Sequence, residues 1–129
     1  MATWPIASLE ELSKQGYLVR LSTYLLQQQA LQKNKSWQHK LMKQQASFLV
    51  DYDLLFRRIT HLLVTQGYDF SSLHPHQTLK KLLLLLDSNA FSEAELSHLV
   101  ECRHNVKYGF MDKATPQAVA ILADLRVGV

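Results

Sequence analysis

The chain has 129 residues, about the size of one domain. Hydrophobic residues make up 47% of it and charged residues 19%, which is typical of a globular domain and argues against a disordered chain. Its single cysteine excludes an internal disulfide and a zinc site built from several thiolates. The 14 lysines and arginines exceed the 11 aspartates and glutamates, a surplus that permits contact with nucleic acid without demanding it.

The longest apolar runs, residues 118–123 and 82–86, are far shorter than the roughly 20 residues that a membrane-spanning helix needs. The first residues, Met-Ala-Thr-Trp-Pro, lack the basic and apolar stretches of a signal peptide. We therefore expect one cytoplasmic domain over residues 1–129, with no membrane contact.

Three helices are expected in the first half of the chain. Ser8 and Glu11 have the spacing of a capping box and Gly16 suits a helix end, which predicts a short helix over 9–15. A second helix is predicted from about 19 to 33, followed by a break at 34–36. Apolar residues at helical spacing then predict a long third helix over 37–66, which ends at Gly67.

Three further helices are expected in the second half. A fourth helix is predicted over 77–86 and is apolar nearly all round at its end, which indicates a central position. Ser92 and Glu95 form another capping-box pattern that opens a helix to about residue 110. Thr115 before Pro116 predicts the start of a last helix over 116–127. This order predicts an all-α fold, an up-and-down helical bundle of about four to five main helices.

Arg103 falls within the apolar stripe of its helix, because the successive steps from Leu96 to Leu99, Arg103 and Val106 are three or four residues. An arginine there must pair with an acid, reach solvent, or face a cleft or a partner subunit. A guanidinium is well shaped to hold phosphate or carboxylate, and Lys107 adds a second positive charge nearby. The alternative is a structural salt bridge between helices, with Asp51, Asp53 or Asp87 as the acid.

Other candidate groups carry weaker signals. His74 and His76 are two close imidazoles, but a zinc site usually needs three or four protein ligands, so no metal is expected. Cys102 and His98 share a helix face, yet no third residue that would orient a nucleophile can be identified. The basic pairs 57–58 and 80–81 are typical of solvated helix faces.

Four segments, in this order, resemble the HEPN superfamily. Residues 46–67 resemble its long central helix, and residues 74–83 resemble its loop histidine and the helix that follows. Residues 103–110 resemble its arginine-bearing helix, and residues 115–125 its closing helix. The resemblance implies an all-α bundle that is often a homodimer and is frequently encoded beside a nucleotidyltransferase or toxin–antitoxin partner.

Many members of this superfamily are RNases in which about four to six residues separate an arginine from a histidine. Arg103 matches the arginine, but no histidine follows at that spacing, and Tyr108 resembles the Arg-x4-Tyr variant of members not known to cut RNA. His104 is adjacent to Arg103, so it points elsewhere on the helix and cannot simply replace the missing base. General acid–base cleavage is therefore not expected.

We therefore expect a non-catalytic or weakly catalytic binding module without a cofactor. It would recognise a nucleotide, RNA or a protein partner through a cleft lined by Arg103, Lys107, Tyr108 and His76. One alternative is a metal-independent RNase toxin that uses Arg103, with Tyr108 or His104 as a stand-in for the histidine. Another is a structural protein that docks a helix and keeps Arg103 in an internal salt bridge.

Overall fold

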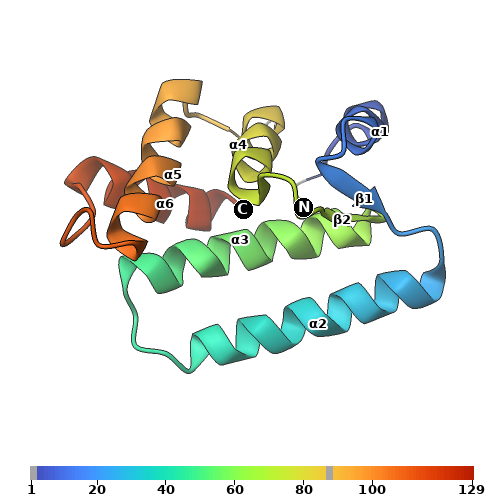
Figure 1. The fold of residues 1–129 in the computed structure, drawn as a ribbon, viewed down its shortest axis with the longest axis horizontal. Coiled ribbons are helices and arrows are strands. Elements are labelled where there is room, and N and C mark those ends of the chain that lie inside the picture. Colours follow the sequence, from blue (N-terminus) through green and yellow to red (C-terminus); the bar gives the residue numbers. More distant parts are fainter. Residues whose placement is uncertain (1–2, 87–88) are drawn as a thin grey trace.

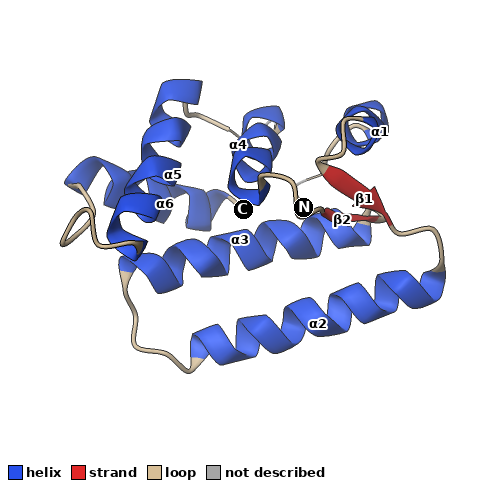
Figure 2. Cartoon of the chain, viewed as in Figure 1, coloured by secondary structure: helices blue, strands red, loops and turns tan. Residues whose placement is uncertain are grey.

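The computed structural model describes residues 3–86 and 89–129, and this part of the chain is mainly helical, as expected (Figure 1). Its short β1 and β2 strands pair with each other (Figure 2). In chain order the elements are α1 (Ile6–Lys14), β1 (Leu18–Arg20), α2 (Tyr24–Met42), α3 (Phe48–Thr65), β2 (Tyr68–Phe70), α4 (Pro75–Leu85), α5 (Glu93–Lys107) and α6 (Pro116–Gly128).

Helix α3 is the central element of the fold. Helix α2 lies along one side of it, whereas α5 and α6 pack against another side and α4 packs on α5 (Figure 1). The α3 side chains Tyr52, Leu55, Ile59 and Leu63 are almost fully buried. They meet buried leucines of α4 and α5, so the main core lies on the side of α3 opposite α2.

The two strands join the N-terminal segment to the end of α3. They pair antiparallel, with Val19 opposite Asp69. Trp4 strengthens this connection, because its backbone exchanges two hydrogen bonds with the Gln66 side chain, of 2.8 and 2.9 Å. The Trp4 indole Nε1 also donates to the Leu82 carbonyl at 2.8 Å, which ties the same segment to α4.

Two expectations for the N-terminal region are wrong. Ser8 and Glu11 do not form a capping box, because α1 begins at Ile6 and places both residues inside the helix. Val19 does not begin a helix but pairs in β1, and α2 starts only after Thr23, whose side chain accepts a hydrogen bond from Leu26 N. β-strand pairing with a distant segment overrides the local helical pattern here.

The expected break at 34–36 and the expected single helix over 37–66 are also wrong. Helix α2 continues through Asn34, because the Asn34 Nδ2 donates to the Arg57 carbonyl on α3 at 2.9 Å. The real break follows Met42, and Ser47 then caps α3 by accepting a hydrogen bond from Val50 N at 3.2 Å.

From residue 75 onward, the helices begin close to the positions that the sequence predicts. Ser92 and Glu95 form a reciprocal capping box at the start of α5. Thr115 caps α6 with its hydroxyl, and Pro116 occupies the first helical position. Within residues 3–86 and 89–129, no helix has the length and apolar character to cross a membrane.

Candidate functional site

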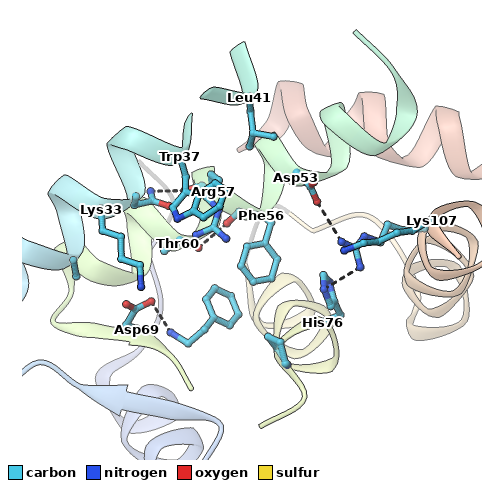
Figure 3. Close-up of a pocket in the computed structure, with 15 residues that line it drawn as sticks. Lys33, Trp37, Leu41, Asp53, Phe56, Arg57, Thr60, Asp69, His76 and Lys107 are labelled. Atoms are coloured by element: carbon cyan, nitrogen blue, oxygen red, sulfur yellow. Dashed lines mark hydrogen bonds and ion pairs between the residues drawn. The ribbon is translucent and has the colours of Figure 1, made fainter. Parts of the chain in front are cut away.

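A cleft of about 440 Å³ opens between α2, α3, β2, α4 and α5. Charged side chains gather at its two ends, with Phe56 between them (Figure 3). We call the first group the Arg103 end; it comprises Asp53, His76, Arg103 and Lys107. We call the second group the Arg57 end; it comprises Lys33, Asn34, Arg57 and Asp69. With His76 neutral, each end carries two basic groups against one acid, a surplus of one positive charge.

Arg103 is only 8% exposed, and three side chains contact its guanidinium. Its Nη1 donates to the His76 Nε2 at 3.2 Å, and its Nη2 lies 3.6 Å from the Asp53 Oδ1. The guanidinium carbon also lies 5.4 Å from the centre of the Tyr52 ring. The Arg103 Nε has no hydrogen-bond partner among the residues that the structure describes. This Nε is itself buried, so a ligand in the cleft would reach its unused hydrogen only if the guanidinium turned toward the cleft.

The arginine also determines which nitrogen of His76 carries the proton. A guanidinium can only donate hydrogen bonds, so the His76 Nε2 accepts and its Nδ1 carries the hydrogen of the neutral ring. The Nδ1 then donates to the Tyr52 hydroxyl, 3.0 Å away. Burial, followed by the charges of Arg103, Lys107 and His104, lowers the pKa of His76 to about 4. Burial likewise raises the pKa of Tyr52 well above its ordinary value. Both rings are thus neutral near pH 7.

Local backbone structure brings His76 to this position. His74 adopts a left-handed conformation, with φ of 43°, and Pro75 follows as the first residue of α4. His76 therefore lies in the first turn of α4, where its ring contacts Phe56 and Tyr52 of α3. A left-handed histidine is uncommon in proteins, and no sequence pattern in the 74–76 segment predicts it.

At the Arg57 end, aromatic rings hold a second arginine. The Arg57 guanidinium carbon lies 5.7 Å from the centre of the Trp37 ring and 5.2 Å from that of Phe56. Burial lowers the pKa of Arg57 and raises the pKa of Asp69. Asn34 is 2% exposed, and its Oδ1 has no hydrogen-bond partner in the described part of the chain.

The sequence did not identify the residues of the Arg57 end as part of a binding site. Asn34 was expected in a break, and Arg57 on a solvated face. Only the register of α2 against α3, fixed by the hydrogen bond from Asn34 to the Arg57 carbonyl, brings Trp37 over the guanidinium. The sequence carries no local signal for that register.

The structure brings together three of the four residues expected to line a binding cleft, namely His76, Arg103 and Lys107. Tyr108 is not among the lining residues; it is 57% exposed, and its ring centre lies 4.8 Å from that of His104. His104 is exposed too, but it lines a second hollow that also includes His76 and Arg103.

Of the acids considered for a salt bridge with Arg103, Asp53 is the one that the structure places beside it. The Asp53 side chain is 40% exposed, so the ion pair lies at the edge of the cleft and not in the core. Asp51 instead pairs with Arg126 at 2.8 Å, and Asp87 lies outside the described residues.

Two other groups were considered from the sequence, the Cys102–His98 pair and the two histidines of residues 74–76. Cys102 is buried, and the His98 Nε2 bonds with the Thr115 hydroxyl at 2.7 Å. Within the described ranges, no three histidine, cysteine or acidic side chains are grouped so that they could hold a metal ion.

The cleft combines a surplus of positive charge with aromatic walls. A buried arginine with an unused donor suits phosphate or carboxylate, and ring faces suit a planar group. Comparison of the chain with family models, with curated proteins and with solved structures found no match.

Proposed function

We propose that this protein is a HEPN-like binding module whose cleft holds a phosphate group of a nucleotide or of RNA. The observation that carries the proposal is the Arg103 guanidinium, which is buried and has an Nε without a partner among the described residues. A phosphate can accept two parallel hydrogen bonds from such a group. Lys107, exposed at the same end, adds a positive charge near the same position.

The walls of the cleft favour a nucleotide over the carboxylate of a protein partner. Phe56 and Phe70 stack with ring centres 4.5 Å apart, and both line the cleft together with Trp37. Bases stack on such aromatic faces regardless of their sequence. A volume of about 440 Å³ is also within the usual range for small-molecule sites.

The test is to measure the binding of inorganic phosphate and adenosine 5′-monophosphate by calorimetry at low salt. Arg103→Met keeps most of the buried side-chain volume but removes the charge, and we expect it to weaken binding of the nucleotide roughly tenfold or more. Arg58→Met is the matched control, because Arg58 is an exposed arginine of α3 that does not line the cleft. If a folded Arg103→Met variant binds the nucleotide as the wild type does, the proposal is wrong.

A second candidate function is metal-independent RNA cleavage, and the position of His76 favours it. The motif lacks a histidine at the expected spacing after Arg103, but the His76 Nε2 lies 3.2 Å from the Arg103 Nη1. When Arg103 turns to a phosphate, this nitrogen is free to take the proton of a ribose 2′-hydroxyl. The 2′-oxygen would attack phosphorus, a cyclic phosphate would form, and the departing 5′-oxygen would take a proton from water.

This second function predicts RNA cleavage in the presence of a chelator, and both Arg103→Met and His76→Gln should abolish it. His39→Gln is the control, because His39 is an exposed histidine of α2 outside the cleft. The absence of cleavage by wild-type protein at high concentration would eliminate this function and leave the binding proposal in place.

As a HEPN-like protein, the chain would act in the cytoplasm as a homodimer, with a nucleotidyltransferase or antitoxin protein as its partner. The support for this assembly is the family resemblance of residues 46–67 and 103–110. Light scattering of the purified chain should give twice its mass of 14.8 kDa. A monomeric mass at about 50 μM would contradict the homodimer.

A further inference from the structure

The Arg57 end of the cleft repeats the charge pattern of the Arg103 end. Each end has one arginine, one lysine and one aspartate, and so the same net charge. Figure 3 shows Lys33 and Asp69 at one end, Asp53 and Lys107 at the other, and Phe56 between them. One bound phosphate would use only one of these ends.

Arg57 is held differently from Arg103: its partly buried guanidinium contacts aromatic rings. Its guanidinium carbon lies 5.7 Å from the centre of the Trp37 ring and 5.2 Å from that of Phe56, and its backbone carbonyl accepts the hydrogen bond from Asn34. These two cation–π contacts restrict the side chain before any ligand binds, so less conformational entropy is lost on binding.

Asp69 lowers the repulsion between the positive charges at this end. Figure 3 shows Lys33 beside Asp69, and Arg57 lines the same cleft, where burial lowers its pKa and the charges of both Asp53 and Asp69 raise it in part. Asp69 is itself held, because its Oδ1 accepts a hydrogen bond from Phe70 N at 2.8 Å. A surplus of one positive charge remains for a ligand.

We propose that the cleft takes one nucleotide unit flanked by two phosphates, with the first phosphate at the Arg103 end and the second at the Arg57 end. The base or ribose between them lies against Phe56 and Phe70, which form the aromatic wall. This inference rests on the proposed function, since it assigns a second anion subsite to the same cleft. Both a free nucleoside 3′,5′-bisphosphate and a segment of an RNA strand have this chemistry.

The test compares three probes by calorimetry at low salt: adenosine 5′-monophosphate, adenosine 3′,5′-bisphosphate and a short oligoadenylate. We expect the bisphosphate to bind the wild type roughly tenfold more tightly than the monophosphate, the usual effect of one added charge-assisted contact. The ratio of the two affinities identifies the second subsite. If the oligonucleotide binds more tightly than the bisphosphate, the source is an RNA strand; if it binds more weakly, the source is a free nucleotide.

Variants at the Arg57 end should remove this ratio without removing monophosphate binding. Arg57→Met removes the guanidinium that lies over Trp37 but keeps most of the side-chain length. Arg57→Lys should restore part of the ratio, and Lys33→Met changes an exposed side chain. Lys35→Met is the matched control, because Lys35 is exposed on α2 and does not line the cleft.

The two proposals fail in different ways. Equal affinities of the monophosphate and the bisphosphate, with Arg103-dependent binding of both, would overturn the second subsite and keep the proposed function. The same ratio in the wild type and in both Arg57→Met and Lys33→Met would also overturn it. Failure of every phosphate probe to bind would overturn both proposals.

Discussion

Replacing His76 by glutamine tests the hydrogen-bond network at the Arg103 end. A glutamine can accept from Arg103 through its Oε1 and donate to the Tyr52 hydroxyl through its Nε2, but it does not titrate. In the wild type, burial and the charges of Arg103, Lys107 and His104 lower the pKa of His76 from 6.5 to about 4. The variant therefore separates the effect of protonation from that of the hydrogen bonds.

The pKa of His76 sets both the sign and the size of the expected effect. Between pH 6.5 and about 4, the unfolded chain binds a proton at His76 that the folded chain does not. The stability that comes from the neutral ring is complete above pH 6.5 and is lost as the pH falls to about 4. The upper limit is about 3 kcal/mol, at roughly 1.4 kcal/mol per pH unit. Because the ring is only half-buried, solvent screening reduces this to about 2 kcal/mol.

The assay is urea unfolding, followed by circular dichroism at pH 7.5 and at pH 4. We expect the wild type to lose about 2 kcal/mol more than His76→Gln on acidification. His39→Gln, at an exposed position on α2, should behave as the wild type does. If the wild type and His76→Gln lose the same free energy of unfolding between these pH values, the argument about His76 is wrong.

Three further predictions concern stability and affinity. Trp4→Phe removes the indole donor to the Leu82 carbonyl and should cost about 1–3 kcal/mol in urea unfolding, because a buried carbonyl loses its partner. Asp53→Asn should change stability by less than about 1 kcal/mol, since the ion pair is at the edge of the cleft, yet it should bind adenosine 5′-monophosphate several-fold more tightly in calorimetry. Gly67→Ala should cost about 1 kcal/mol in urea unfolding, because φ at this position is +92°. Gly128→Ala is the control, in helix α6 with open space around it, and should be neutral or slightly stabilising. Equal effects of the two substitutions would show that the backbone conformation at Gly67 is not what requires glycine.

The helical class and several helix ends could be predicted because their signals are local. Ser92 and Glu95 lie three residues apart and complete their capping box within one turn. Gly16 and Gly67 end helices through their own left-handed backbone. The position of Arg103 on the apolar face of its helix could also be predicted, because it follows from the spacing of residues within a single helix.

The errors occurred where distant contacts decide the structure. Asparagine often marks a break, but Asn34 stays helical because α3 offers it a carbonyl acceptor. Val19 pairs with a strand that is remote in the sequence. The proximity of His76 and Arg103 depends on the left-handed turn at His74 and on the packing of α4 against α5. A pattern within one helix contains no information on these contacts.

The β1–β2 ribbon has a consequence for the order in which the cleft forms during folding. The contact between Asn34 and Arg57 spans 23 residues, and that between His76 and Arg103 spans 27. The pairing of Val19 with Asp69 spans 50 residues (19 to 69), so its closure costs about 0.6 kcal/mol more in chain entropy. We therefore expect the helical contacts to form first and the ribbon last. Because Asp69 and Phe70 belong to the ribbon, the wall of the cleft that they form would also be the first to open when the native protein fluctuates.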